Sequence, residues 1–108
     1  MPCTPEVLVD VTDLNVSICR GCQRVGFSYK NVLIGFDKED FKAFVYSFSE
    51  LQFETSAVLF PIGERRIIVN SVHCDIQFSF NREEFENIRV HLNQSITLLN
   101  AKEILSHH

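Results

Sequence analysis

The chain has 108 residues, and its 10 Lys and Arg residues against 14 Asp and Glu residues give a formal net charge of −4. A content of 45% hydrophobic and 22% charged residues predicts one globular domain over residues 1–108 and excludes a wholly disordered chain. No apolar run approaches the ~18 residues of a membrane span, and the N-terminus lacks the features of a signal peptide. We therefore expect a cytoplasmic protein without a membrane partner, and the negative charge argues against nucleic acid as the main partner.

The first predicted element is a β-hairpin near the N-terminus. Residues 6–11 alternate, so we expect Val7, Val9 and Val11 to face the core while the intervening residues face solvent. A two-residue turn then leads into a second strand over residues 14–19.

A strand–strand–helix unit follows and occurs twice, over about residues 22–52 and 65–99. The segment 36–41 recurs as residues 80–85, with three of the six positions identical and the other three conservative. Since each unit buries one face of its strands and one face of its helix, the two copies belong to one layered structure. The predicted fold is α+β, with an antiparallel sheet of five to seven strands and two helices on one face.

The strands of the two copies are predicted over residues 22–29, 32–36, 65–73 and 76–80. Two residues remain between the strands of each copy, Lys30-Asn31 in the first and Cys74-Asp75 in the second. We predict tight turns at both places, because Asn and Asp tolerate the left-handed conformation that such turns require. A further short strand is predicted between the copies, over residues 57–62.

Both helix starts carry capping residues. Asp37 is a candidate N-cap of the first helix, and Asn81 with Glu84 forms a candidate capping box for the second. Each helix is predicted to be amphipathic, with one apolar stripe at helical spacing. The stripes are Phe41, Phe44, Val45, Phe48 and Leu51 in the first helix, and Phe85, Ile88, Leu92, Ile96 and Leu99 in the second.

The segment Cys19-Arg20-Gly21-Cys22 is the one motif with recognisable chemistry. A C-x-x-C occurs in redox dithiols and as half of a zinc site, and here it also fits a hairpin turn at Arg20-Gly21 flanked by two structural cysteines. The redox interpretation lacks a helix N-terminus, because strands are predicted on both sides. We favour the structural turn.

A zinc site at this motif would need four ligands, of which Cys19 and Cys22 are the tentative pair. The further candidates are His73, Cys74, Cys3 and His91. His73 and Cys74 adjoin a predicted turn, and only a two-fold arrangement of the copies would bring that turn near Cys22. We therefore expect no cofactor, with zinc as the alternative.

Basic residues gather on the predicted strands and in the turns between them. They are Arg20, Arg24, Lys30, Arg65 and Arg66, with Phe27 and Tyr29 among them. Cations with interleaved aromatic residues are typical of platforms for single-stranded nucleic acid, but sheet edges also carry cations that block aggregation. We favour the second explanation because the net charge is negative.

Three stretches together resemble a known family. They are the Cys-x-Gly-Cys of residues 19–22, the Asn-Val-Leu-Ile-Gly-Phe of residues 31–36 after an aromatic strand, and the Glu-Asp-Phe of residues 39–41. They resemble a family of small proteins from Bacteroidetes-type bacteria that is defined as a domain of unknown function. The resemblance covers the first half of the chain and implies that the C-x-x-C spacing is a family feature. It assigns no catalytic or binding residue.

The sequence contains no nucleophile elbow and no glycine-rich phosphate loop, so we predict a non-enzymatic protein. The leading prediction is protein–protein interaction or self-association, and the alternative is a zinc-stabilised module built on Cys19 and Cys22. Phe53 and Phe60 lie outside the repeated units. They either seal the core or form an exposed apolar patch.

Overall fold

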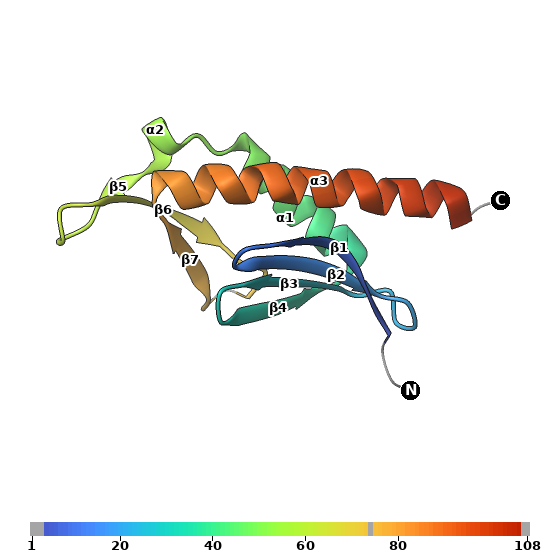
Figure 1. The fold of residues 1–108 in the computed structure, drawn as a ribbon. Coiled ribbons are helices and arrows are strands. Elements are labelled where there is room, and N and C mark those ends of the chain that lie inside the picture. The colour runs from blue at the N-terminus through green and yellow to red at the C-terminus, as the bar shows by residue number, and fades with distance from the viewer. Residues whose placement is uncertain (1–3, 74, 107–108) are drawn as a thin grey trace.

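A computed structural model describes residues 4–73 and 75–106, which form an α+β fold (Figure 1). The strands are β1 (Pro5–Val11), β2 (Leu14–Cys19), β3 (Val25–Tyr29), β4 (Val32–Phe36), β5 (Val58–Leu59), β6 (Arg65–Asn70) and β7 (Gln77–Phe80). The helices are α1 (Lys38–Glu50), α2 (Phe53–Ser56) and α3 (Arg82–Ser106). The fold class therefore agrees with the prediction.

The strands form two antiparallel sheets, where the sequence predicted one. Four strands pair in the order β1-β2-β3-β4, and three pair in the order β5-β6-β7. Every pair joins strands that are consecutive in the chain, which short connections allow. The helices α1 and α2 separate β4 from β5, so the chain starts a second sheet instead of extending the edge of the first.

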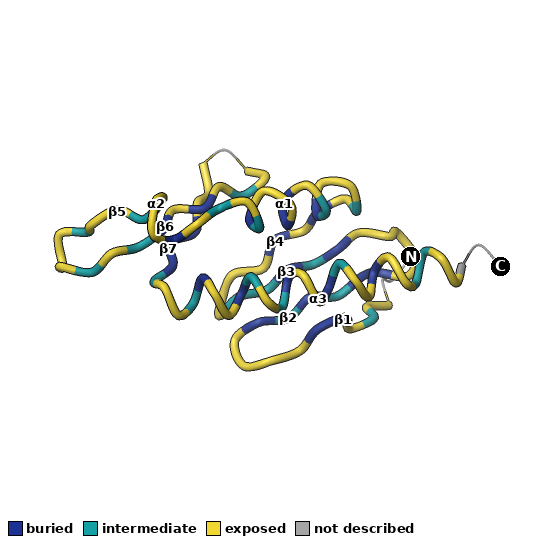
Figure 2. The backbone as a smooth tube through the Cα atoms, turned by 90° about the horizontal axis from the view of Figure 1, so that it is seen from above, coloured by how far each residue is buried: buried dark blue, intermediate teal, exposed yellow. Residues whose placement is uncertain are grey.

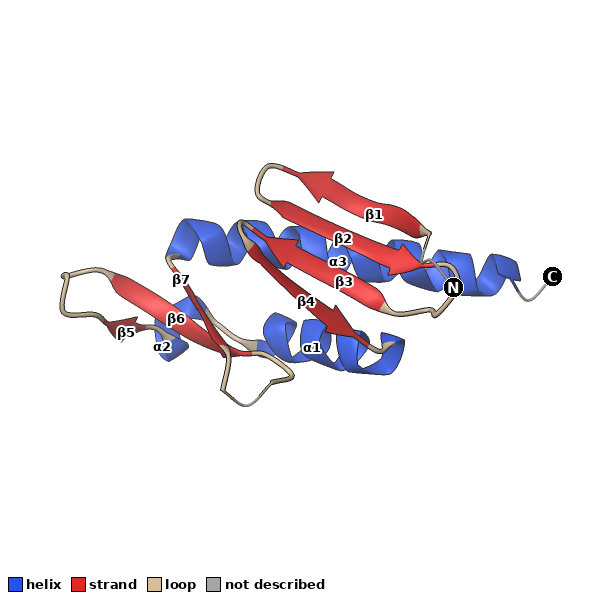
Figure 3. Ribbon diagram, turned by 90° about the horizontal axis from the view of Figure 1, so that it is seen from below, coloured by secondary structure: helices blue, strands red, loops and turns tan. Residues whose placement is uncertain are grey.

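The two long helices lie on the same side of the four-stranded sheet (Figures 1 and 3). The helix α3 packs against α1 and against strands of both sheets, namely β1, β2, β6 and β7. The molecule is elongated, with extents of 51 × 26 × 25 Å. The β5–β6 hairpin forms one end and the C-terminal part of α3 forms the other (Figure 1).

Phenylalanine rings fill the core between the sheets and the helices. Nine of the ten are buried: Phe27, Phe36, Phe41, Phe44, Phe48, Phe53, Phe78, Phe80 and Phe85. The rings of Phe48 and Phe85 stack with centroids 4.8 Å apart and join α1 to α3. The rings of Phe27 and Phe78 join the two sheets at 5.8 Å. Phe53 therefore seals the core, and only Phe60 remains half-buried.

The predicted capping box is present at the start of α3. The Glu84 N–H donates to Asn81 Oδ1 at 2.8 Å, and the Asn81 N–H donates to Glu84 Oε1 at 3.0 Å. Asp37 occupies the N-cap position of α1 but makes no side-chain cap bond. Its carboxylate accepts instead from Arg24 Nη1 at 2.6 Å, because an ion pair competes with the cap for the same oxygen atoms.

The C-terminus of α1 is capped by a side chain that the sequence did not indicate. The guanidinium of Arg89 on α3 donates to the Ser49 carbonyl at 2.9 Å and to the Leu51 carbonyl. The same guanidinium lies over the Phe85 ring, 4.6 Å from its centroid. Arg89 thus satisfies carbonyls that a helix end leaves without partners and fixes α1 against α3.

The predicted alternation along β1 is wrong. Leu8 and Val9 are both buried, whereas Val7 and Val11 are exposed. A β-bulge between Val7 and Val9 shifts the register with β2. The extra residue reverses which side chains of the following residues face the core.

Of the predicted tight turns, Lys30-Asn31 is confirmed, with Lys30 at a φ of 55° between β3 and β4. The turn predicted at Cys74-Asp75 is wrong, because β6 ends before residue 71 and β7 begins after residue 76. The two strands stop pairing at Asn70 and Gln77, so the connection between them is longer than two residues. Within it the Ser71 hydroxyl donates to the Ile76 carbonyl at 2.7 Å. Cys74 itself lies outside the described residues.

Candidate functional site

The β5–β6 hairpin presents apolar side chains at one end of the molecule. Residues 57–63, Ala-Val-Leu-Phe-Pro-Ile-Gly, carry no charge. Val58, Leu59 and Ile62 are 50%, 70% and 77% exposed. Figure 2 shows that most of this hairpin is exposed, in contrast to the strands beneath the helices. The strand predicted over residues 57–62 is shorter in the structure, where β5 covers only Val58–Leu59.

Backbone hydrogen bonds hold the hairpin in shape. The Phe60 N–H donates to the Glu64 carbonyl at 2.9 Å, and the Gly63 N–H donates to the Phe60 carbonyl at 2.9 Å. Gly63 has a φ of 84°, a conformation that side chains with a Cβ disfavour. The exposed apolar side chains therefore sit on a defined turn.

Charged residues of both signs surround the base of this hairpin. Arg66 Nη1 lies 2.7 Å from a carboxylate oxygen of Glu64, and Arg65 Nη1 lies 3.6 Å from Glu54. Arg82 at the start of α3 also pairs with Glu54. An uncharged surface with a charged rim is the usual anatomy of a protein–protein interface.

A polar cluster around Glu84 joins the hairpin's sheet to the four-stranded sheet. The Tyr29 hydroxyl and the Lys30 ammonium reach Glu84 Oε2 at 2.9 and 3.1 Å, and Arg66 Nη2 reaches Oε1 at 3.3 Å. Burial acts to raise the pKa of Glu84, but the Asn81 N–H, Lys30 and Tyr29 together hold it below its ordinary value. Burial, and then the Glu84 carboxylate, raise the pKa of Tyr29. The cluster therefore contains an ionised Glu84 beside a protonated Tyr29 at neutral pH.

The C-x-x-C motif forms one closed turn between β2 and β3. The Cys19 N–H donates to the Arg24 carbonyl at 2.8 Å, and the Gln23 N–H donates to the Cys19 carbonyl at 2.9 Å. The Cys22 N–H donates to Cys19 Sγ at 3.4 Å. Cys19 is buried and Cys22 is exposed. The predicted two-residue turn at positions 20–21 is wrong, because Gln23, with a φ of 62°, reverses the chain and Arg24 faces Cys19.

The other predicted metal ligands do not join this turn. His73 is exposed in the connection between β6 and β7, where its N–H donates to Ser71 Oγ at 3.0 Å. This connection and the cysteine turn lie at separate places in the molecule (Figure 3). His91 lies on α3 with Nδ1 2.8 Å from the Asn87 carbonyl.

Two predicted ligands, Cys3 and Cys74, lie outside the described residues. Within residues 4–73 and 75–106, no three His, Cys, Asp or Glu residues gather in a way that could hold a metal ion. Of the sequence candidates, the structure thus brings together only Cys19 and Cys22 in its described part.

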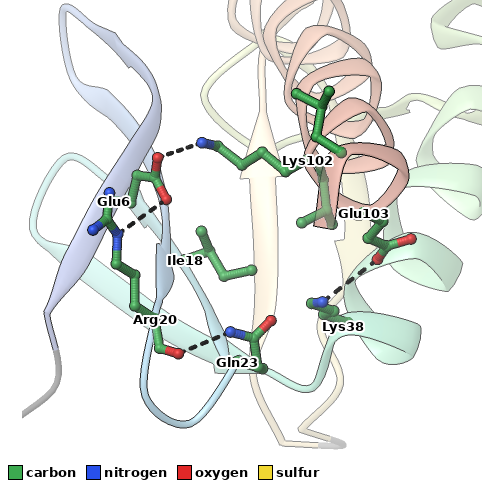
Figure 4. A pocket seen from close by; sticks show the side chains of 9 residues that line it. Glu6, Ile18, Arg20, Gln23, Lys38, Lys102 and Glu103 are labelled. Atoms are coloured by element: carbon green, nitrogen blue, oxygen red, sulfur yellow. Dashed lines mark hydrogen bonds and ion pairs between the residues drawn. The ribbon is translucent and has the colours of Figure 1, made fainter. Parts of the chain in front are cut away.

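A cavity of about 400 Å³ opens beside the cysteine turn (Figure 4). Its charged lining comes from four parts of the chain: Glu6, Arg20, Lys38, Lys102 and Glu103. Glu6 accepts from Arg20 at 3.4 Å and also from Lys102. Glu103 pairs with Lys38 at 3.7 Å. Nothing in the sequence indicates this cavity, because Glu6 and Lys102 are separated by almost the whole chain.

Ion pairs fix the ionisation of the two carboxylates at this cavity. Hydrogen bonding to Lys102, opposed by burial, lowers the pKa of Glu6, and hydrogen bonding to Lys42 lowers the pKa of Glu103. Both are therefore charged at neutral pH, and their charges are balanced by neighbouring lysines. Among the described residues that line the cavity there is no Ser, Thr, Cys or His.

The five basic residues singled out in the sequence each lie beside a carboxylate, and only Arg65 and Arg66 are on a strand. The pairs are Arg20 with Glu6, Arg24 with Asp37, Lys30 with Glu84, Arg65 with Glu54, and Arg66 with Glu64 and Glu84. Phe27, which the sequence placed among them, is buried in the core. The geometry thus differs from a platform for single-stranded nucleic acid, which needs cations and aromatic faces open to the ligand.

Comparison with known proteins identifies one family. A family model described as "Family of unknown function (DUF6686)" matches residues 1–107. The match covers nearly the whole chain, including residues 19–41, and agrees with the expectation of a family of unknown function. No curated protein and no solved structure matches the chain. Among the helices of the described residues, none is long and apolar enough to cross a membrane.

Proposed function

We propose that this chain, which belongs to that family of unknown function, is a non-enzymatic protein of the cytoplasm of Bacteroidetes-type bacteria that self-associates through its β5–β6 hairpin. The observation that carries the proposal is the exposed, uncharged stretch of residues 57–63 at the projecting end of the molecule. We call this stretch the apolar hairpin.

Removing the apolar hairpin from water is favourable. Burial of apolar surface contributes about 25 cal/mol per Å², and Val58, Leu59 and Ile62 all offer such surface. Contiguous exposed apolar patches on monomers commonly mark interaction sites. Because hydrogen bonds already fix the turn, little conformational entropy is lost when a partner covers it.

The charge pattern favours a second copy of the chain as the partner. The apolar hairpin has no charge, whereas the whole chain has a net charge of −4, so two copies repel least where their hairpins meet. The rim carries acids and cations, including Glu64 and Arg65. A two-fold axis through the hairpin therefore brings acids of one copy towards cations of the other.

The position of β5 in its sheet favours the same partner. It is an edge strand in the order β5-β6-β7, and an antiparallel neighbour can add to such an edge. Pro61 follows closely and cannot donate a backbone hydrogen bond, so the added ladder is short. The contact then depends mainly on side chains, and we expect a dimer that dissociates on dilution.

Light scattering over a range of concentrations tests this proposal with a matched pair of variants. Leu59 on β5 is 70% exposed and Leu33 on the edge strand β4 is 73% exposed, so Leu59→Glu and Leu33→Glu make the same change at similar sites. We expect the mass of the natural chain to rise with concentration. Leu59→Glu should weaken association by about 2 kcal/mol, roughly thirtyfold, and Leu33→Glu should leave it unchanged.

A natural chain that is monomeric at every concentration would contradict self-association. Equal loss of association in Leu59→Glu and Leu33→Glu would show that the hairpin is not the interface. Circular dichroism of both variants confirms that each has kept its fold.

A further inference from the structure

A cavity of about 390 Å³ opens between α1 and the end of β6, which lies beside that helix (Figure 3). One wall is residues 68–72, which are the end of β6 and the two residues after it. Successive residues of a strand point to opposite faces of its sheet, so consecutive residues line one cavity where the edge of the strand faces it. We call this cavity the edge groove. Its other wall is one face of α1 at helical spacing: Asp40, Ala43, Phe44, Ser47, Phe48 and Leu51.

The hydrogen bonds of β6 show which of its backbone groups point to this edge. In an antiparallel ladder, residues that bond to one neighbouring strand alternate with residues that bond to the other. The Ser71 N–H donates to the Ile76 carbonyl at 3.2 Å, which continues the β6–β7 ladder. The backbone groups of Val69 therefore face β7, and those of Ile68 and Asn70 face the opposite side, where β5 lies.

The strand β5 ends its pairing before these backbone groups. Among the described residues it pairs with Arg65 and Arg66 alone, because the chain before it forms the helix α2 and cannot continue the ladder. Over residues 67–70, the described strands thus cover β6 only on the β7 side. A peptide in the extended conformation can add to such an edge and pair with Ile68 and Asn70.

The lining of the edge groove indicates which side chains such a peptide carries. Phe44, Phe48 and Val69 give it an apolar floor, and Asp40 is the one charged residue among its described lining. The groove therefore has one negative charge, on a chain with a net charge of −4. Apolar side chains together with a Lys or Arg side chain are complementary to this lining.

We propose that the edge groove binds an extended, basic segment of another protein, which adds a strand to β6 beside α1. Backbone hydrogen bonds to Ile68 and Asn70 provide affinity, and the apolar floor and Asp40 set the sequence preference. A second copy of the chain is disfavoured here, because it is itself acidic. The lining includes none of residues 57–63, so this binding is independent of the proposed self-association.

Selection of random linear peptides displayed on phage tests the proposal, with the full natural chain as the target. We expect the enriched peptides to alternate apolar and polar residues, to contain Lys or Arg, and to lack Pro at their centre. The enriched sequences are then synthesised with a fluorescent label, and their affinities are measured by fluorescence anisotropy. A selection that enriches no binding peptide, or that enriches acidic peptides, would overturn the proposal.

A matched pair of variants tests the role of charge. Asp40→Asn and Glu39→Gln each remove one carboxylate from the exposed first turn of α1, but of the two only Asp40 lines the groove. Asp40→Asn should weaken binding of the basic peptides about three- to fivefold, and Glu39→Gln should weaken it less than half as much. Equal weakening by both variants would mean that the acidic chain attracts the peptides without a defined site, and would overturn the proposal.

A proline substitution tests the strand edge itself. Ile68→Pro removes an N–H that faces the groove and leaves the bonds from β6 to β7 in place, so it should weaken peptide binding more than about tenfold. Circular dichroism checks the fold of this variant. A second variant, Ala43→Arg, fills the groove from an exposed position on α1 and should weaken binding at least as much.

Undiminished binding by either variant in its folded form would overturn the proposal. Leu59→Glu in the apolar hairpin should bind the peptides as tightly as the natural chain does, because Leu59 is not part of the groove. Loss of peptide binding in Leu59→Glu would place the peptides on the hairpin and would also overturn the proposal.

Discussion

The body of the molecule and the apolar hairpin use the same kind of residue in opposite ways. In the body, which comprises the four-stranded sheet with α1 and α3, Phe36, Phe41 and Phe85 are completely buried. In the hairpin, Leu59 and Ile62 are mostly exposed. Apolar residues in the body therefore stabilise the fold, whereas those in the hairpin contribute little to folding and remain available for a partner.

The Glu84 cluster lies where these two regions meet. It connects α3 and the turn after β3 with Arg66 on β6, the strand that forms one side of the hairpin. Substitutions in the body should therefore lower the free energy of unfolding most, those in the Glu84 cluster less, and those in the hairpin least.

The largest effect is expected from Phe85→Ala. Its ring is fully buried, stacks on Phe48 and lies under the Arg89 guanidinium, so its removal leaves a cavity and a helix cap without support. We expect a loss of about 3–5 kcal/mol in the free energy of unfolding, measured by urea denaturation. Phe60→Ala in the hairpin should lose less than half as much. Equal losses would contradict the distinction between body and hairpin.

A smaller effect is expected at the junction, from Asn81→Ala. Asn81 shares a reciprocal capping box with Glu84, and loss of such a cap costs about 1–2 kcal/mol. Asp37→Ala is the matched control at the other helix, where the side chain makes no cap bond and only an exposed ion pair with Arg24. We expect that variant to change stability by no more than about 0.5 kcal/mol. Thermal unfolding of both variants checks this, and similar losses would contradict it.

The Glu84 cluster should also make the free energy of unfolding depend on pH. The folded-state pKa of Glu84 is lowered from 4.5, so its contribution is present above the unfolded pKa and is lost as the pH falls through the folded pKa. We expect Glu84→Gln to flatten the fall in stability between about pH 5 and about pH 3. The slope that remains comes from Glu6 and Glu103, whose pKa values are also lowered. Glu83→Gln, the same change at the exposed neighbouring residue, is the matched control.

The smallest effect on stability is expected from Leu59→Ala. Because this side chain is exposed in the single chain, the free energy of unfolding should change by no more than about 0.5 kcal/mol at dilutions where the chain is monomeric. Denaturant titration at low protein concentration measures it. A loss above about 1 kcal/mol would mean that the hairpin is part of the folding core.

The helix features that depend on neighbouring residues were predicted well from the sequence, whereas two of the tight turns were not. The capping box at Asn81 and Glu84 and the apolar stripes of both helices are present, because helical spacing and caps are set within a few residues. The bulge after Val7 was missed because it inserts one residue without changing the composition of the strand. The division into two sheets was also missed, since strand pairing depends on how α1 and α3 pack.

The candidate sites were predicted only in part, for the same reason. Cys19 and Cys22 are recognisable because their spacing is local, and the structure changes only the shape of their turn. The cavity beside them depends on Glu6 and Lys102, which are brought together by the whole fold. The hairpin was indicated by the short strand predicted over residues 57–62 and by Phe60, which lacked a place in the repeat, while the exposure of Leu59 required the structure.

Amide hydrogen exchange at low and high protein concentration tests the central claim, that the apolar hairpin is where two copies meet. The account predicts that protection of the amides in residues 57–63 increases with concentration, while the amides of β2 and β3 in the body keep the same protection. The natural chain would be measured beside Leu59→Glu, in which the increase should disappear. Unchanged exchange in residues 57–63, or an increase confined to another surface, would contradict the account.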